Sequence, residues 1–143
     1  MLFSTDPILF IQEQEKRVLK YYSSNREKLQ GFGGRHHFAD WYLHELYIHE
    51  NKCHYCNTDI LDIRRLINAG IIGGRKVSGG GLRGPNVEVD RKDPFGIYNN
   101  ANCVLSCYYC NNDKSNTFDY ETYLNIIGPS KHQALLRLLE RER

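Results

Sequence analysis

Four cysteines of the chain stand in two Cys-x-x-Cys pairs, a spacing typical of metal ligands. The pairs are Cys53 with Cys56 and Cys107 with Cys110. Two thiolates three residues apart can occupy two corners of a tetrahedron, and four thiolates complete the coordination of Zn²⁺. Residues 57–106 make the gap between the pairs longer than in compact zinc modules. We therefore predict one structural zinc ion per chain; the alternatives are buried thiols or a redox pair.

A carboxylate and an amide lie close to the second pair. Asp90 comes near the end of the segment NVEVDR, and Asn111 directly follows Cys110. If a hairpin that contains Asp90 packs on the helix that contains Asn111, both side chains meet in one cleft. Such a sparse set of oxygen ligands suits Mg²⁺, which keeps several waters and binds substrate phosphate. Lys114 lies one turn beyond Asn111 on the same helix face, where it could hold a phosphate.

A basic, glycine-rich segment lies between the two cysteine pairs. Residues 73–86 carry Arg75, Lys76 and Arg83 and contain no acidic residue. Such a loop can follow a phosphate backbone, so these three side chains are candidates for nucleic-acid contacts. The alternative is a solvated flexible loop, because the net charge of +2 does not by itself indicate nucleic acid.

Helices are predicted before and around the first cysteine pair. Asp6 is a candidate N-cap with Pro7 at the first helical position, and apolar residues then recur at helical spacing. The pattern predicts a helix over 7–29 and a second helix over 38–50, whose aromatic face we assign to the core. A third helix is predicted over 58–69, where Ala-Gly is a good stop signal.

The segment that carries Asp90 and Asn111 is predicted as strand, loop, strand and helix. VEVDR alternates as a strand does, and residues 103–106 form a short apolar run in which Cys103 is a small core residue. The next helix is predicted over 107–115. Two more helices are predicted: one capped by Asp119 and closed after Ile127 by Gly128-Pro129, and one over 131–143 after a capping box at Ser130 and Gln133.

Length and composition indicate one globular domain. The chain has 143 residues, of which 41% are hydrophobic and 25% charged, and this excludes intrinsic disorder. Its longest apolar run is far below the roughly 20 residues that cross a membrane, and we see no signal peptide. We expect a helical arm over 1–50, a core over 51–127 with the zinc site and the basic insertion, and a C-terminal helix over 128–143.

Residues 52–124 resemble the HNH, or ββα-metal, nucleases, in the subset that has Asp-Arg in place of Asp-His together with a four-cysteine zinc site. More distantly, the segment resembles rare-cutting HNH restriction enzymes. The resemblance implies an α+β fold with a ββα-metal core, a structural zinc and surrounding helices. It also implies a metal-dependent DNA endonuclease that leaves 5′-phosphate and 3′-hydroxyl ends. The matching residues are both cysteine pairs, Asp90, Arg91, Tyr98, Asn102, Asn111 and Lys114.

The resemblance further implies roles for single residues. Asp90 and Asn111 would hold the catalytic Mg²⁺ or Mn²⁺, and Asn102 would brace the loop between the strands. Lys114 would approach the backbone of double-stranded DNA. A homodimer would suit a restriction enzyme that cuts a palindrome, and homing or phage DNA processing are the other roles of this class. We expect a cytoplasmic protein, bacterial or encoded by a phage.

One residue departs from the family pattern. Most HNH nucleases have a histidine as general base where this chain has Arg91, and arginine cannot accept a proton. Arg91 could instead clamp the scissile phosphate and stabilise developing charge. Our first candidate for the base is Tyr98, which could also simply pack the hairpin loop; the second is His36 or His37, and water activated by the metal alone is the third. Two further candidates, expected to serve packing inside the cysteine knuckle, are His54 and Tyr55.

Three functions are compatible with these features. The first is a DNA endonuclease, and the second is a zinc-stabilised DNA-binding module without catalysis, which the missing histidine favours. The third is a small adaptor protein whose fold is stabilised by zinc. Asp90 together with Asn111 favours the endonuclease, because a module that only binds DNA needs neither side chain.

Overall fold

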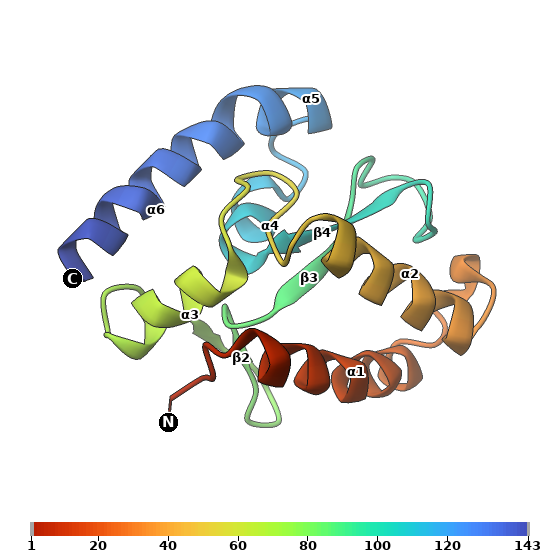
Figure 1. Cartoon of the computed structure of the whole chain (residues 1–143). Helices are drawn as coiled ribbons and strands as arrows, with labels where there is room; N and C mark the ends of the chain where they lie inside the picture. The colour runs from red at the N-terminus through yellow and green to blue at the C-terminus, as the bar shows by residue number, and fades with distance from the viewer. Residues whose placement is uncertain (1, 143) are drawn as a thin grey trace.

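Two short antiparallel hairpins and a set of helices make up the protein, which confirms the predicted α+β class. The structure is a computed structural model and describes residues 2–142 (Figure 1). The elements in chain order are α1 (Pro7–Ser24), the 3-10 turn η1 (Gln30–Phe32), α2 (Arg35–Ile48), α3 (Ile60–Asn68), β1 (Arg75–Lys76), β2 (Leu82–Arg83), β3 (Val87–Arg91), β4 (Cys103–Cys107), α4 (Tyr108–Lys114), α5 (Tyr120–Thr122), the π-helical turn η2 (Tyr123–Ile127) and α6 (Gly128–Glu142).

The hairpin β3–β4 lies at the centre of the molecule (Figure 1). Its register pairs Val87 with Cys107 and Arg91 with Cys103, and all five residues of β4 are buried. Helix α2 packs against β4, and α4 packs against both strands. Since β4 leads straight into α4, any side chain on the first turns of α4 is held beside the hairpin.

Helices α1 and α2 pack against each other and cover the hairpin. Asp6 caps α1 as predicted, because its carboxylate accepts hydrogen bonds from the backbone N–H groups of Ile8 and Leu9. Helix α1 ends at Ser24, earlier than predicted, and Gly33 reverses the chain with a φ of 84°. Helix α2 begins at Arg35, three residues earlier than predicted, and its aromatic face is buried as expected.

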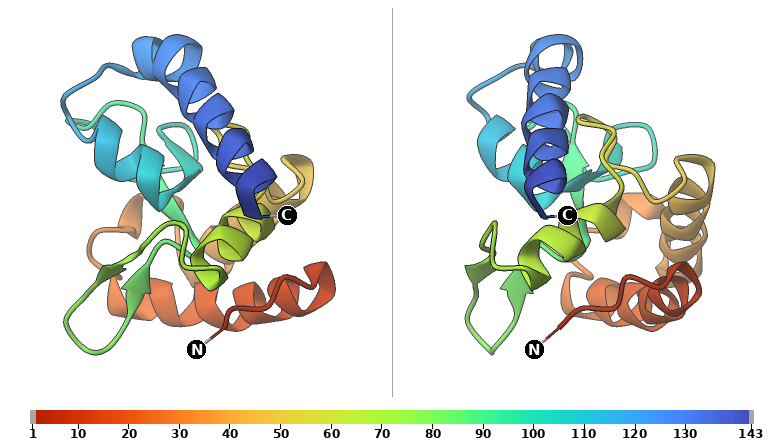
Figure 2. Two further views of the ribbon diagram at one scale, coloured as in Figure 1. Left: turned by 90° about the vertical axis from the view of Figure 1, so that its left-hand side faces the viewer. Right: turned by 60° about the vertical axis from the view of Figure 1, so that its left-hand side comes forward.

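The predicted break between the last two helices is wrong, because α5, η2 and α6 form one uninterrupted helical segment (Figure 2). The N–H of Gly128 bonds to the carbonyl of Tyr123, five residues back, and this wider π turn accommodates Pro129, which has no N–H. The Ser130 hydroxyl donates to the carbonyl of Ile126, so it does not cap a new helix. A Cβ on Gly128 would lie 2.3 Å from the Tyr55 carbonyl oxygen, so only glycine allows this close approach.

One hydrophobic core joins the N-terminal helices, the hairpin and α6. It runs from Phe10 through Leu46, Leu66 and Leu105 to Leu135. Residues 73–86 do not form the irregular loop that the glycines suggested, since β1 and β2 pair there as a small hairpin with Arg75 opposite Arg83. None of the helices in residues 2–142 is long and apolar enough to cross a membrane.

Candidate metal centre and hairpin cleft

The four cysteines of the two Cys-x-x-Cys pairs form one buried cluster. Their sulfur atoms all lie within 4.8 Å of one another, and none of the four is in a disulfide. The Sγ atoms of Cys56 and Cys107, one from each pair, are 3.9 Å apart. A zinc tetrahedron with bonds of about 2.3 Å places neighbouring sulfurs about 3.8 Å apart. The number, type and spacing of the donors therefore fit one Zn²⁺, as predicted.

Local backbone contacts position both halves of this cluster. The backbone N–H of Cys53 bonds to the Thr58 carbonyl, and that of His54 bonds to the Leu105 carbonyl, so the first knuckle is pinned onto β4. Cys107 ends β4 and caps α4, since its sulfur accepts a hydrogen bond from the N–H of Cys110. A metal on these sulfurs would therefore fix the angle between β4 and α4.

A cleft of about 360 Å³, here called the hairpin cleft, opens where β3, α4 and the loop after β3 meet. The tertiary fold brings five of the predicted site residues to it: Arg83, Asp90, Arg91, Tyr98 and Asn111. The other residues that line the cleft are Val89, Pro94, Phe95, Asn112, Ser115 and Asn116.

Asp90 is 7% exposed and already has two partners. The Tyr55 hydroxyl donates a hydrogen bond of 2.6 Å to its Oδ2, and the Lys114 Nζ lies 3.4 Å from the same oxygen. Burial raises the pKa of Asp90, while the Tyr55 hydrogen bond and the Lys114 charge act in the opposite direction. Both contacts use Oδ2, so Oδ1 is the Asp90 oxygen that could bind a metal.

The prediction that Lys114 contacts a DNA backbone is wrong. Its side chain is 0% exposed, and its Nζ donates a hydrogen bond of 3.0 Å to the Arg91 carbonyl besides its ion pair with Asp90. Helix α4 packs this face against β3, so the position one turn beyond Asn111 points into the protein. The sequence spacing identified the correct face of α4 but could not show that β3 covers it.

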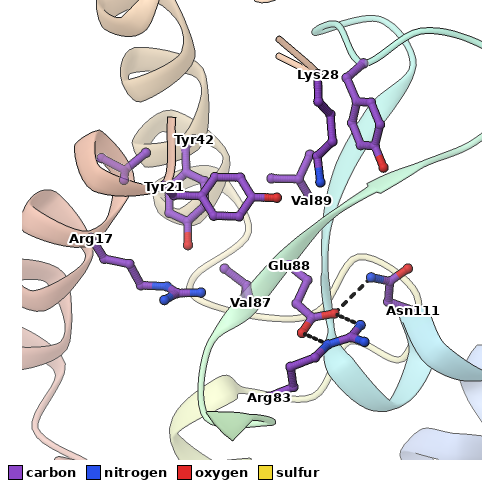
Figure 3. A pocket seen from close by; sticks show the side chains of 11 residues that line it. Arg17, Tyr21, Lys28, Tyr42, Arg83, Val87, Glu88, Val89 and Asn111 are labelled. Atoms are coloured by element: carbon purple, nitrogen blue, oxygen red, sulfur yellow. Dashed lines mark hydrogen bonds and ion pairs between the residues drawn. The ribbon is translucent and has the colours of Figure 1, made fainter. Parts of the chain in front are cut away.

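Asn111 is held by Glu88, a residue that sequence reasoning missed. The Asn111 amide donates a hydrogen bond of 2.9 Å to Glu88 Oε1, and Arg83 binds both carboxylate oxygens of Glu88 at 2.9 and 2.6 Å (Figure 3). The amide nitrogen is thereby committed to Glu88, and the amide oxygen of Asn111 is left for another partner. The signal was present: Glu88 precedes Asp90 by two residues, so both side chains belong to one face of the strand.

Arg91 and Tyr98 pack together at the mouth of the cleft. The guanidinium carbon of Arg91 lies 4.5 Å from the centre of the Tyr98 ring, and Arg91 donates to the Gly96 carbonyl at 3.0 Å. Asn102 braces the loop between the strands, as the resemblance implied. Its side chain accepts a hydrogen bond from the Asp93 N–H and donates to the carbonyls of Asp93 and Ile97, and it does not line the cleft.

The histidine candidates for a general base do not reach the cleft. His36 and His37 are exposed in the first turn of α2, and neither is among the residues that line it. The ring of His54 bonds to the Tyr120 hydroxyl at 2.8 Å, and burial, with the charges of His49 and Lys92, lowers the pKa of His54 to about 4. These positions leave tyrosines as the candidates closest to Asp90 and Arg91.

Tyr55 and Tyr98 are placed differently. Tyr55 is buried and touches Asp90, and burial together with the Asp90 charge raises the pKa of Tyr55 well above its usual range. Tyr98 is partly exposed and lines the cleft. The structure thus brings the Tyr55 hydroxyl to the Asp90 carboxylate and makes Tyr98 part of the cleft wall.

The three basic residues of segment 73–86 do not act as one group. Arg75 and Lys76 are exposed on β1 and outside the hairpin cleft, whereas Arg83 lines it. Arg83 also has partners within the protein, since it pairs with Glu88 and its guanidinium carbon lies 4.6 Å from the centre of the Tyr108 ring.

Comparisons of the chain with protein-family models, with curated proteins and with solved structures gave no match.

Proposed function

We propose that the chain is a metal-dependent DNA endonuclease of the HNH class, which hydrolyses phosphodiester bonds to 5′-phosphate and 3′-hydroxyl ends. The main support is the β3–β4–α4 unit, in which Asp90 and Asn111 line one cleft next to a buried four-cysteine cluster. A module that only binds DNA has no need to bring a carboxylate and an amide together in a cleft.

The oxygen donors of the cleft support a catalytic Mg²⁺ or Mn²⁺. Asp90 Oδ1 and the amide oxygen of Asn111 are the donors we assign to it, because Oδ2 and the amide nitrogen already have partners. Two protein oxygens are a typical share for Mg²⁺, which takes its other ligands from water and substrate phosphate. When bound, such an ion stabilises charge on a phosphoryl oxygen and acidifies a coordinated water.

We assign to Arg91 the binding of the scissile phosphate. Its guanidinium is fixed by the Gly96 carbonyl and the Tyr98 ring, and no carboxylate pairs with it among residues 2–142. A preorganised cation without a counter-charge stabilises the negative charge that grows on phosphate oxygens as the P–O bond breaks. Arg91 therefore supplies charge and not proton transfer.

The proton of the attacking water goes, in this proposal, to a tyrosine that acts as its phenolate. Tyr98 is our candidate because it lines the cleft and packs on Arg91. Tyr55 is not an acceptor, because its hydroxyl donates to Asp90 and burial together with the Asp90 charge raises the pKa of Tyr55 well above its usual range. Both Tyr98→Phe and Tyr55→Phe remove only the hydroxyl, so a rate lost in Tyr98→Phe and kept in Tyr55→Phe would support Tyr98 as the acceptor.

The test of the function is plasmid nicking by the zinc-loaded protein with Mg²⁺, with Mn²⁺ and without added divalent ion. The matched variants are Asn111→Ala, which removes a proposed ligand, and Asn125→Ala, an exposed asparagine outside the cleft. We expect ion-dependent nicking by the wild type and by Asn125→Ala, and none by Asn111→Ala. Equal nicking by the two variants would refute the assigned site.

A second candidate function is a zinc-stabilised DNA-binding module without catalysis. The observation that favours it is the Lys114 ammonium 3.4 Å from Asp90, because a buried cation already balances the carboxylate and opposes a metal ion there. This module would bind duplex DNA in the nicking assay and leave it intact with every ion. Sedimentation with and without DNA would show whether the chain acts as the homodimer that a palindromic site requires.

A further inference from the structure

A second cavity, here called the α1 pocket, lies between α1 and the central hairpin. It has a volume of about 410 Å³ and shares Arg83, Val89, Tyr98 and Asn111 with the hairpin cleft, so the two cavities adjoin. Its remaining lining residues are Arg17, Val18, Tyr21, Lys28, Tyr42, Val87 and Glu88 (Figure 3).

The α1 pocket carries an excess of positive charge. Three cations line it, Arg17, Lys28 and Arg83, against the single carboxylate of Glu88. Arg83 is paired with Glu88, whereas neither Arg17 nor Lys28 takes part in an ion pair among the described residues. Figure 3 shows the side chains of Arg17 and Lys28 extending into the space between α1 and β3. Two unpaired cations thus line one pocket whose carboxylate, Glu88, is already paired with Arg83.

The wall between the two cavities brings two cations to one tyrosine ring. The ring of Tyr98 has the Lys28 ammonium 4.9 Å from its centre and the Arg91 guanidinium carbon at 4.5 Å. Two like charges around one ring repel each other. Burial lowers the pKa of Lys28, and the charge of Arg91 acts in the same direction. An anion shared between the α1 pocket and the cleft would relieve this repulsion.

The chemistry of the pocket favours a phosphate over a nucleobase. Stacking of a base needs a free aromatic face, but the Tyr21 ring already stacks on Phe38 at 5.9 Å and Tyr98 faces two cations. What the pocket offers is an exposed guanidinium and an exposed ammonium, the two groups that bind phosphate oxygens.

We infer that the α1 pocket is a second phosphate-binding subsite, in which Arg17 and Lys28 hold a phosphate of the substrate strand adjacent to the scissile one. This inference rests on the proposed endonuclease function. It gives α1 a role beyond covering the core, because the helix then sets the register of the strand in the hairpin cleft. Each cavity would take one phosphate, with Tyr98 between them.

The first experiment measures how duplex binding depends on salt for the variant Arg17→Gln/Lys28→Gln. The control Lys16→Gln/Lys20→Gln removes the same number of charges from exposed positions of α1 that do not line the pocket. The salt slope is the decrease of log affinity with log salt concentration, and one lost phosphate contact lowers it by about one. Between about 50 and 200 mM salt, the affinity of the variant should therefore fall by about 3.5-fold less than that of the wild type. We expect this change for the pocket variant and a smaller change for the control.

The second experiment uses duplexes with one neutral methylphosphonate linkage at each position around the cleaved bond. We expect the wild type to bind more weakly when the neutral linkage replaces one neighbour of the scissile phosphate. The pocket variant should show no further loss at that position, because the contact is already absent. Wild-type-like sensitivity of the pocket variant at every position, or a salt slope equal to that of the control, would overturn the subsite and leave the endonuclease proposal intact. A wild type that neither binds nor cuts DNA would refute both.

Discussion

The two antiparallel hairpins of the protein use the same backbone pairing and have opposite surroundings. Each strand of β3–β4 has five residues, most of them buried between α2 and α4, and the hairpin ends at the cysteine cluster. The strands of β1–β2 have two residues each, and β1 is exposed. Side chains on β3 are therefore fixed by packing on several sides, whereas those at the tip of β1–β2 are free to adjust.

The shorter hairpin is attached to the longer one at its base. Arg83 at the end of β2 binds Glu88 on β3, and the Tyr109 hydroxyl on α4 donates to the Gly73 carbonyl at 2.8 Å. Its turn has Gly79 and Gly80 at φ values of 89° and 91°, where other residues would be strained. In the proposed function, β3–β4 holds the groups for chemistry and β1 presents exposed charge.

The largest effect should come from breaking the cysteine cluster that ends β4. Cys107→Ser removes one of four zinc ligands, and structural zinc supplies about 10–16 kcal/mol in small zinc modules, so we expect loss of zinc and of cooperative folding. Cys103→Ser, on the same strand and outside the cluster, should cost about 1–3 kcal/mol. Metal analysis and thermal unfolding test this, and an unchanged melting temperature in Cys107→Ser would contradict a structural zinc.

The next largest effect should come from the buried ion pair between Lys114 on α4 and Asp90 on β3. Lys114→Met leaves the Asp90 carboxylate without its counter-charge and should cost about 3–5 kcal/mol at neutral pH. Burial already raises the pKa of Asp90, and removal of Lys114 raises it further. In this variant the folded state binds a proton at Asp90 more readily than the unfolded state does. The loss of stability is therefore full when the pH is above the raised pKa of Asp90, and it shrinks as the pH falls through that pKa.

Urea unfolding at neutral and mildly acidic pH measures this dependence. The control is Lys131→Met, which breaks the more exposed Lys131–Asp113 pair of 3.1 Å and should cost about 0–1 kcal/mol. The double variant Lys114→Met/Asp90→Asn should recover most of the stability, because it removes both charges. If Lys114→Met is as stable as Lys131→Met at neutral pH, the buried pair does not hold α4 on β3.

A smaller effect, on rate and not on stability, is expected at Arg91, the half-buried end of β3. If Arg91 binds the scissile phosphate, Arg91→Ala should lose about a hundredfold in cleavage rate and Arg91→Lys should keep part of it. Arg91→His should not restore the rate by itself, since no imidazole is needed in a site where a tyrosine accepts the proton. Single-turnover cleavage measures these rates, and full activity of Arg91→Ala would exclude the clamp.

The smallest effect should come from the exposed strand β1. Arg75→Gln/Lys76→Gln removes two exposed charges, so stability should change by no more than about 0.5 kcal/mol. If both side chains contact DNA phosphates, the salt slope of binding should fall by about two. Arg83→Gln should behave differently and lose stability as well, because Arg83 ties β2 to Glu88. An unchanged salt slope in the double variant would mean that this hairpin is merely solvated.

Several features of the fold and of the candidate site could be predicted because their signals are local. The capping carboxylate of Asp6, the alternation in VEVDR and the spacing of each cysteine pair all act over a few residues. The loop-bracing role of Asn102, implied by the resemblance, also agrees with its hydrogen bonds. The continuous helix through Pro129 was not predictable, because the π turn before it and the contact of Gly128 with Tyr55 depend on a distant segment.

The sequence by itself determined which residues can bind a metal, which segments form the hairpin, and that Asn111 follows a ligand on a helix. Only the tertiary structure decided which neighbours these side chains meet. In the folded protein, Lys114 is buried against Asp90, the Asn111 amide donates a hydrogen bond to Glu88, and Arg17 of α1 lies beside the hairpin. The physical reason is that a helix or strand period fixes the face on which a side chain lies, whereas the packing of distant elements fixes what covers that face.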